Sequence, residues 1–256
     1  MAVDERGLVV LVGASGAFGS AIVDRVVAEG YTVLAVGRGA DQLARLVERH
    51  GDHVVPCALD IADDACVESL RGAIATTGSH VHAVVHGPGV AVAGGVMTVP
   101  VDALLNAVDI KVGGLLRLVR AADPYLRDGS RIIAIAGHYG LEPTAYAAAA
   151  GAANAALFNV VRQLSLAYGG RGVTAHTIAP GPADTERLHR VAADRARLQG
   201  STTEAVLDDM RGESSIGRLV TPAEVAWAVA MLLQPEASAM TGSTLMLDAG
   251  RRRGLP

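Results

Sequence analysis

Short apolar runs rich in β-branched residues alternate along the chain with longer stretches of helical pattern. The runs are continuous rather than interrupted by polar residues, which is typical of strands buried on both faces of a parallel sheet. They predict strands at Leu8–Val12, Thr32–Val36, His53–Ala58, Ala83–His86, Arg131–Ala136, Val173–Ile178 and Thr244–Leu247. The stretches between them predict helices at Phe18–Glu29, Ala40–His50, Asp64–Thr76, Val101–Leu126, Ala147–Tyr168 and Pro222–Leu233. We therefore expect one α/β domain over residues 1–256, a doubly wound parallel sheet of about seven strands with helices on both faces.

One late segment departs from this alternation. Residues 184–217 are polar and helical in pattern and contain no run that predicts a strand. They follow a Pro-Gly-Pro turn directly, and an insertion at this point usually covers the site as a mobile lid. We predict such a lid over the substrate, with ordinary surface decoration as the alternative.

Composition and charge exclude several classes of protein. Half of the 256 residues are hydrophobic and 19% are charged, which excludes intrinsic disorder. A formal net charge of −4 offers no broad attraction for nucleic acid or a membrane surface, so neither is expected as a partner. The longest low-charge stretch, Ala145–Val161, is interrupted by Gly and Asn and predicts a buried helix rather than a membrane span. Cys57 and Cys66 lack metal-ligand spacing and no secretory signal is visible, so we expect a cytoplasmic protein without a metal site.

A glycine-rich loop joins the first predicted strand to the first predicted helix. Gly13, Gly16 and Gly19 allow the backbone to turn tightly and to approach a pyrophosphate, while the helix N-terminus offers free N–H groups and a positive dipole. Ser15 and Phe18 belong to the same loop. Because the loop stands in the strand–turn–helix context that dinucleotide sites require, we predict that these residues bind a dinucleotide.

The end of the second predicted strand bears on which dinucleotide is bound. NAD-selective sites usually place an acid there to bind the ribose 2′-hydroxyl. This chain has Arg38 after Gly37 instead, and an arginine without an acid suits the 2′-phosphate of NADP(H). We predict NADP(H) rather than NAD(H), with a solvated loop arginine as the alternative.

Further motifs follow in a fixed order along the chain. They are Asp60-Ile61 after the third strand, His86-Gly87-Pro88-Gly89 after the fourth, and Pro180-Gly181 with Thr185 after the sixth. With the glycine loop, they resemble the short-chain dehydrogenase/reductase family from Leu8 to about Gly250. The resemblance implies a Rossmann-like fold, a nicotinamide cofactor contacted by these motifs, a small-molecule substrate, and a homodimer or homotetramer.

The catalytic positions of that family are all replaced. The usual tetrad is an Asn in the fourth helix, a Ser ending the fifth strand, and a Tyr-x-x-x-Lys pair on the next helix. Ungapped alignment places Lys111, Gly137, Ala150 and Asn154 at these positions, in that order. The family's spacing of thirteen between Ser and Tyr is kept between Gly137 and Ala150, so the register is self-consistent.

Lys111 and Asn154 exchange the residue types of two tetrad positions. Lys111 is also the only lysine in the chain, whose Lys and Arg total 22. Lysine carries a compact ammonium with a tunable pKa, whereas arginine stays protonated. We hypothesise that Lys111 reaches across the site to bond the nicotinamide ribose and to place positive charge beside the reacting group. A structural ammonium that fills space is the alternative.

The missing tyrosine leaves open which group donates a proton. His138 directly follows the serine position, and its imidazole titrates near neutral pH. Tyr139 and Tyr146 lie close by in sequence, and Tyr146 stands four residues before the tyrosine position. We favour His138, although a hydrogen-bonded structural histidine and a packing tyrosine are the alternatives. His86 is interpreted as a nucleotide contact rather than an acid.

Three functions fit these observations. The first is an NADP(H)-dependent reductase with a rearranged active site, acting on a conjugated alkene, an imine or an unusual carbonyl, because such reductions demand less of a tyrosine acid. The second is a non-redox cyclase, dehydratase or isomerase, and the third a catalytically silent nucleotide-binding regulator. The retained nucleotide motifs favour the first, and the replaced tetrad favours the others. The alanine-rich Ala147–Ala153 suggests a roomy apolar pocket, hence a bulky substrate.

Overall fold

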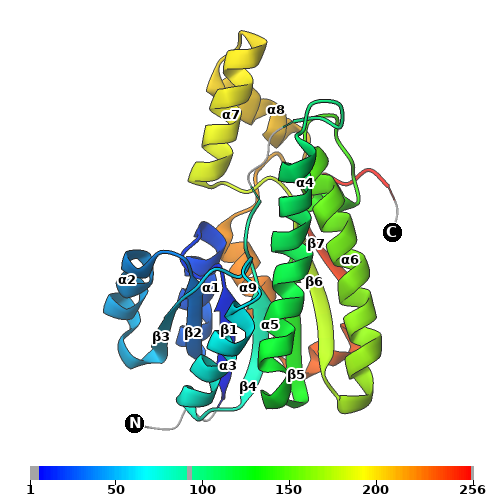
Figure 1. The fold of residues 1–256 in the computed structure, drawn as a ribbon. Helices are drawn as coiled ribbons and strands as arrows, with labels where there is room; N and C mark the ends of the chain where they lie inside the picture. The colour runs from blue at the N-terminus through cyan, green and yellow to red at the C-terminus, as the bar shows by residue number, and fades with distance from the viewer. Residues whose placement is uncertain (1–5, 91–93, 255–256) are drawn as a thin grey trace.

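The computed structural model of the chain describes residues 6–90 and 94–254. Its sheet has the strand order β3-β2-β1-β4-β5-β6-β7, and each neighbouring pair is parallel (Figure 1). The strands are β1 (Leu8–Val12), β2 (Thr32–Gly37), β3 (Val54–Ala58), β4 (Val81–His86), β5 (Leu126–Ile135), β6 (Thr174–Pro180) and β7 (Thr244–Leu247). The predicted doubly wound fold is confirmed. The strand order reverses between β1 and β4, which is where such sheets bind ligands, at the carboxyl ends of the strands.

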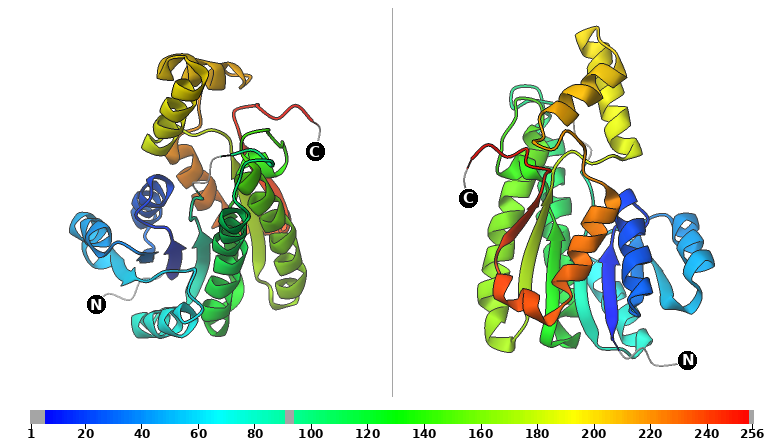
Figure 2. Two further views of the ribbon diagram at one scale, coloured as in Figure 1. Left: turned by 45° about the horizontal axis from the view of Figure 1, so that its top comes forward. Right: turned by 180° about the vertical axis from the view of Figure 1, so that it is seen from behind.

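Helices cover both faces of the sheet (Figures 1 and 2). They are α1 (Ala17–Ala28), α2 (Ala40–His50), α3 (Cys66–Thr77), α4 (Val101–Val108), α5 (Gly114–Ala122), α6 (Ala148–Tyr168), α7 (Glu186–Gln199), α8 (Thr203–Gly212) and α9 (Pro222–Leu232). Short turns of 3-10 helix lie at η1 (Gly51–His53), η3 (Asp123–Tyr125), η4 (His138–Gly140), η5 (Gly169–Arg171) and η6 (Pro235–Met240). None of the described helices is long and apolar enough to cross a membrane.

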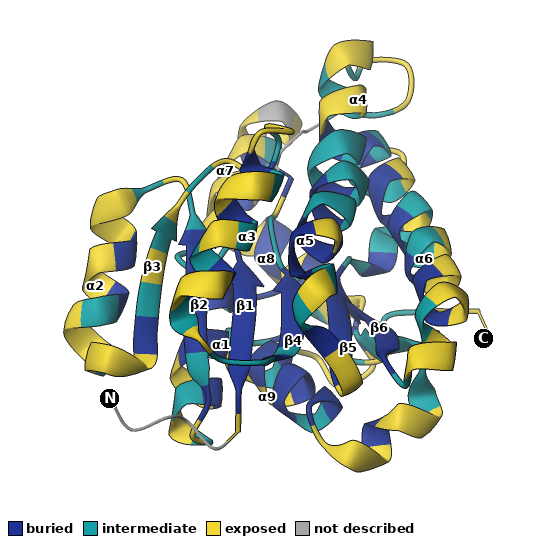
Figure 3. Ribbon diagram, turned by 60° about the horizontal axis from the view of Figure 1, so that its bottom comes forward, coloured by how far each residue is buried: buried dark blue, intermediate teal, exposed yellow. Residues whose placement is uncertain are grey.

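Two apolar cores form because successive side chains of a strand point to opposite faces. Val9 and Leu11 of β1 pack into the core under α1, α2 and α9, whereas Leu8 and Val10 pack into the core under α3, α5 and α6. The inner strands β1, β2, β4 and β6 are therefore almost wholly buried, whereas the edge strand β3 is partly exposed and the helices keep exposed outer faces (Figure 3). This arrangement explains why the strand sequences are continuous apolar runs and do not alternate between apolar and polar residues.

The long helix predicted over Val101–Leu126 is divided in the structure. Between α4 and α5, residues Asp109–Gly113 form η2, one turn of π-helix, and β5 begins already at Leu126. Helical periodicity does not reveal a π turn, because a single inserted residue changes the pattern little. Such turns occur frequently at functional sites, and this one contains Lys111.

The segment between β6 and α9 forms the α7–α8 hairpin, which projects beyond one end of the sheet (Figures 1 and 2). Its two helices pack on each other through a small apolar cluster of their own. That cluster consists of Ala192, Ala196, Val206, Leu207, Met210 and Leu219. The hairpin follows the carboxyl end of β6, so it stands at the edge of the sheet where ligands bind.

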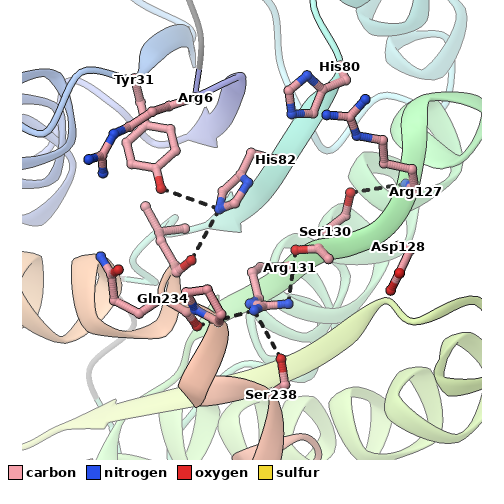
Figure 4. Close-up of a pocket in the computed structure, with 13 residues that line it drawn as sticks. Arg6, Tyr31, His80, His82, Arg127, Asp128, Ser130, Arg131, Gln234 and Ser238 are labelled. Atoms are coloured by element: carbon pink, nitrogen blue, oxygen red, sulfur yellow. Dashed lines mark hydrogen bonds between the residues drawn. The ribbon is translucent and has the colours of Figure 1, made fainter.

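A groove of about 430 Å³ lies at the opposite, amino edge of the sheet (Figure 4). Arg131 is 2% exposed there, and its guanidinium donates hydrogen bonds to neutral oxygens at the end of α9 and beside it. The acceptors are the carbonyls of Gly129, Leu232 and Gln234 and the hydroxyl of Ser238, at 2.9–3.2 Å. His82 Nε2 lies 3.2 Å from the carbonyl of Leu233. These bonds satisfy carbonyls that the end of a helix leaves without partners, so the basic groups here hold α9 in place.

Arg131→Met is expected to lower the free energy of unfolding by about 2–4 kcal/mol, because it leaves buried carbonyls at the end of α9 without donors. Urea denaturation at pH 7 measures the change. Arg127→Ala is the matched control, because Arg127 is an exposed arginine of the same groove and should cost less than about 0.5 kcal/mol. Equal losses in the two variants would contradict this role for Arg131.

Candidate active site

The loop between β1 and α1 forms a cradle of backbone groups. Gly13 adopts a positive φ of 84°, and its N–H donates to the carbonyl of Val36 at 2.9 Å. A Cβ atom on Gly19 would overlap the carbonyl oxygen of Gly13, so the helix can approach the loop only with glycine there. No side chain caps the N-terminus of α1, where Gly16 is the N-cap residue. The N–H groups of the first turn are thus left for an anionic ligand, and the cradle fits a dinucleotide pyrophosphate.

Three further residues predicted to contact the cofactor, Arg38, Asp60 and Ile61, follow the ends of β2 and β3. Arg38 is exposed, and among the described residues its side chain has no ion-pair partner. Asp60 is exposed as well, with one carboxylate oxygen accepting a bond from the backbone two residues further on. Ile61 is 5% exposed and belongs to the core, and Ser15 Oγ lies 3.4 Å from Oε1 of Gln42.

A pocket of about 200 Å³ opens at the carboxyl ends of β4, β5 and β6. It brings together part of the predicted set, namely Phe18, Gly87, Lys111, His138, Asn154, Pro180 and Gly181. The pocket walls do not include the other predicted residues, namely Gly13, Ser15, Gly16, Gly19, Arg38, Asp60, Ile61, His86, Tyr146 and Thr185. Two cations, Lys111 and Arg187, line the pocket, and no described Asp or Glu does. Nor do the described residues contain a group of three His, Cys, Asp or Glu side chains that could hold a metal ion.

Lys111 lies at the junction of η2 with the sheet. Its side chain is buried, with 6% of the residue exposed, and Nζ donates a hydrogen bond of 2.7 Å to the carbonyl of Ile135. Burial, and then the charge of Arg187, lower the pKa of Lys111 to about 7. The pocket therefore contains an ammonium group that gains or loses its proton near neutral pH and that a bound negative charge would stabilise.

The side chain of His86, a residue predicted to contact the nucleotide, lies inside the fold. His86 is fully buried, packs against Gly114, and lies with Nε2 3.0 Å from the carbonyl of Ile110. Burial, and then the charge of Lys111, lower the pKa of His86 to about 3, so its ring is neutral at pH 7. A neutral ring donates from Nε2 to Ile110, and His86 thereby helps to hold the turn that carries Lys111.

Gly137 and Asn154 occupy adjoining space. Asn154 is 5% exposed, and a Cβ atom on Gly137 would lie 2.9 Å from its Nδ2. The amide of Asn154 therefore crowds the space in which a side chain at position 137, the predicted serine position, would lie. Asn154 Oδ1 is buried and has no hydrogen-bond partner among the described residues. Such an acceptor costs about 1–3 kcal/mol unless a donor reaches it, so a ligand hydroxyl or water is its natural partner.

The proton-donor candidates differ in their access to the pocket. His138 is 3% exposed and hydrogen-bonded to the carbonyl of Pro180, and burial lowers the pKa of its ring to about 4. It is therefore neutral at pH 7, which makes it a poor acid there. Tyr139 lines the pocket, whereas Tyr146 lies behind it, with the two hydroxyl oxygens 3.2 Å apart.

Arg187 is the site residue that sequence reasoning missed. Thr185 caps α7 by accepting a bond from the backbone of Leu188 at 3.3 Å, which places Arg187 in the first turn of the helix. Its exposed side chain reaches across the pocket, and the guanidinium lies against Gly89. Among the described residues Arg187 has no ion-pair partner. The signal in the sequence is its position two residues after Thr185, which is predicted to contact the cofactor.

Comparisons with known proteins agree with this architecture. A family model described as Enoyl-(Acyl carrier protein) reductase matches residues 13–252. Short-chain reductase protein NovJ of Streptomyces niveus is 27% identical over 259 residues, covering 98% of this chain and 96% of NovJ. 3beta-hydroxysteroid dehydrogenase 1 of Eggerthella lenta is 28% identical, covering 94% of this chain and 92% of that protein. An uncharacterized short-chain type dehydrogenase/reductase of Sinorhizobium fredii, y4vI, is 27% identical, and the match spans less than half, 43%, of its length.

Solved structures share the fold over nearly the whole chain. L-sorbose reductase from Gluconobacter frateurii, complexed with NADPH and L-sorbose, superposes with a TM-score of 0.90 at 23% identity, covering 99% of both chains. An NADPH-bound short chain oxidoreductase from Pseudomonas aeruginosa, described as containing an atypical catalytic center, gives a TM-score of 0.87 at 23% identity, again covering 99% of both chains. From the matched family model, the relatives and the fold together, the chain belongs to the short-chain dehydrogenase/reductase family.

Proposed function

We propose that this protein is an NADP(H)-dependent oxidoreductase with a rearranged active site. The observation that carries the proposal is that the glycine-rich loop before α1 and the pocket of Lys111 adjoin each other. A Cβ atom on Gly13 would lie 3.2 Å from the carbonyl carbon of Gly87, and Gly87 also lines the pocket of Lys111. One surface thus runs from the free N–H groups of α1 to the buried ammonium, as a dinucleotide with a reacting end requires.

Each polar group of the site has a distinct task in this proposal. The backbone N–H groups of α1 and the Arg187 guanidinium bind the pyrophosphate, and Arg38 binds a 2′-phosphate. Asn154 Oδ1 and Lys111 bond the ribose hydroxyls, and Lys111 also places positive charge where negative charge develops on the substrate. When bound, the reduced nicotinamide supplies a hydride. Arg187 and Leu188 of α7 line the pocket, which supports the α7–α8 hairpin as a lid.

The proposed substrates are conjugated alkenes, imines or unusual carbonyl compounds. Gly137 and Ala150 offer neither the hydroxyl nor the phenol that ordinary ketone reduction by this family uses. The pocket wall includes the apolar Val90, Ala150, Ala153 and Leu188, which suits an apolar substrate. Two of the NADPH-bound proteins that share the fold are described as an L-sorbose reductase and an actinorhodin polyketide ketoreductase.

We further propose that the chain forms a homodimer or homotetramer through α4, α5 and α6. Large apolar side chains are exposed on two of these helices, Val101 at 72% and Leu105 at 60% on α4 and Leu166 at 69% on α6. Such residues on neighbouring helices are what an interface would cover.

Calorimetric titration with NADPH and NADH tests the proposed cofactor. Wild-type protein is expected to bind NADPH more tightly, and Arg38→Ala to weaken NADPH binding about 10–100-fold with little effect on NADH, because only NADPH carries the 2′-phosphate. Arg45→Ala removes an exposed arginine of α2 and is the matched control, with NADPH binding unchanged. Failure of wild-type protein to bind either nucleotide would overturn the redox function.

A further inference from the structure

Two tyrosines form a hydrogen-bonded pair at the wall of the pocket. Tyr139 belongs to η4, which follows β5, and Tyr146 lies just before α6. Their hydroxyl oxygens are 3.2 Å apart, and the rings meet edge to face, with centroids at 5.9 Å and an interplanar angle of 85°. Of the two, only Tyr139 lines the pocket, so the pair joins the pocket wall to the segment that precedes α6.

Tyr139 stands beside the position that has lost the family's tyrosine. η4 packs on α6, and a Cβ atom on Gly151 would lie 3.3 Å from the carbonyl oxygen of Tyr139. Gly151 directly follows Ala150, and Ala150 and Tyr139 line the same pocket. Ala150 carries only a methyl group at the predicted tyrosine position, and Tyr139 is the phenol that lines the same pocket.

The groups around the pair make the two phenols unequal. Burial, and then the hydrogen bond to Tyr146, raise the pKa of Tyr139 above its ordinary value. Burial also acts to raise the pKa of Tyr146, but its hydrogen bonds with Tyr139 and Arg251 outweigh it, so the net shift is downward. The Arg195 guanidinium lies 4.6 Å from the ring centroid of Tyr146, and the neutral His138 ring lies 4.1 Å from that of Tyr139.

Arg251 is itself fixed by the α7–α8 hairpin. It forms an ion pair with Glu213 and donates a hydrogen bond of 3.3 Å to the carbonyl of Met210 in α8. Tyr146 is therefore held between Arg195 of α7 and Arg251 of the carboxyl-terminal segment. Both cations act to lower the pKa of each phenol, but at Tyr139 burial and the hydrogen bond to Tyr146 outweigh them, so the phenolate is favoured at Tyr146.

We propose that Tyr139 donates the proton in the reaction of this enzyme and that Tyr146 returns a proton to it. This inference rests on the proposed redox function, in which hydride and its two electrons come from the reduced nicotinamide. The Tyr139 O–H bond breaks as its proton completes the new O–H, N–H or C–H bond of the product. The Tyr139 phenolate then takes the proton of the Tyr146 hydroxyl, and Tyr146 takes one from water. The two hydroxyl oxygens lie 3.2 Å apart, within reach for this second transfer, and the opposite directions of the two pKa shifts favour it.

Carbon-13 NMR of protein labelled at tyrosine Cζ tests the pair without any substrate. The chain has five tyrosines, and Tyr→Phe variants assign the signals. We expect the Tyr146 signal to titrate at lower pH than that of free tyrosine, and the Tyr139 signal at higher pH. Tyr139→Phe should move the Tyr146 midpoint upward, and Tyr146→Phe should move the Tyr139 midpoint downward. Tyr125→Phe is the control, because Tyr125 contacts Arg71 in the opposite part of the fold and should move neither. Independent titration of the two phenols would overturn the relay.

Turnover of NADPH with 2-cyclohexenone, a cyclic imine and a 1,2-diketone tests the catalytic step. Tyr139→Phe is expected to lower kcat at least 100-fold, and Tyr146→Phe about 10-fold, both with unchanged affinity for NADPH. Full kcat in Tyr139→Phe would overturn the assignment. Wild-type protein that bound neither nucleotide or reduced none of these probes would count against the redox function, and the NMR titrations would then decide on the pair by themselves.

Discussion

Lys111→Met is expected to be more stable than wild-type protein at pH 7 and much less active. The ammonium is buried against one carbonyl, and no described Asp or Glu lines its pocket. Replacing such a group by an apolar side chain of similar length should raise the free energy of unfolding by about 1–4 kcal/mol. Nucleotide affinity should fall about 10–100-fold and turnover about 100–1,000-fold, because the variant cannot stabilise negative charge. If Lys111 serves catalysis at a cost in stability, its removal should stabilise the protein and lower its activity.

The stability difference between Lys111→Met and wild-type protein should depend on pH. The pKa of Lys111 is lowered to about 7 in the folded protein, from an ordinary value of 10.5. Between these values the unfolded chain binds more protons than the folded one, so the stability of wild-type protein rises with pH, by at most about 1.4 kcal/mol per pH unit. The advantage of Lys111→Met should therefore be full below about pH 7 and shrink toward pH 10.5.

Urea denaturation of both proteins across this pH range, with calorimetric titration of NADPH, measures the two effects. Arg120→Met is the matched control, since it removes an exposed cation from α5 and should change stability by less than about 0.5 kcal/mol at every pH. A Lys111→Met protein that was less stable at pH 7 and bound NADPH normally would assign the lysine a structural role instead.

Gly19→Ala is expected to destabilise the protein by more than about 3 kcal/mol and to lower nucleotide affinity more than 100-fold. The new methyl group would overlap the carbonyl oxygen of Gly13 and main-chain atoms of Ala14. Backbone atoms cannot rotate away as side chains do, so α1 or the loop must shift. Either movement displaces the N–H groups that form the cradle.

Two further glycine variants separate the fold from the ligand. Gly16→Ala should fold normally, because its φ is −75° and the added Cβ atom would lie 3.4 Å from the carbonyl oxygen of Gly13. It should still weaken nucleotide binding if the pyrophosphate approaches this backbone. Gly72→Ala points into open space on α3 and should stabilise the protein by up to about 1 kcal/mol. Urea denaturation and calorimetry would refute the argument if Gly19→Ala were as stable as Gly72→Ala.

Local pattern was sufficient for most of the architecture. The strands Leu8–Val12 and Thr244–Leu247 and the helix Ala40–His50 have the predicted bounds, because each depends on apolar periodicity and on turn residues within a few positions. The π turn was not predictable in this way. It interrupts a helix whose periodicity continues through it, and it is held in part by His86 from a strand that precedes it.

The sequence by itself determined the doubly wound fold and the glycine-rich loop after the first strand, because those features lie in short, ordered motifs, and it predicts that all four tetrad positions are replaced. Only the tertiary structure decided which side chains share the pocket. It placed Lys111 against Ile135, Asn154 against Gly137, Arg187 against Gly89, and Tyr139 beside Tyr146. It also buried His86 against the carbonyl of Ile110. These contacts join different helices, strands and loops, and no local propensity encodes them, since they exist only once the sheet has ordered its strands and the helices have packed on it.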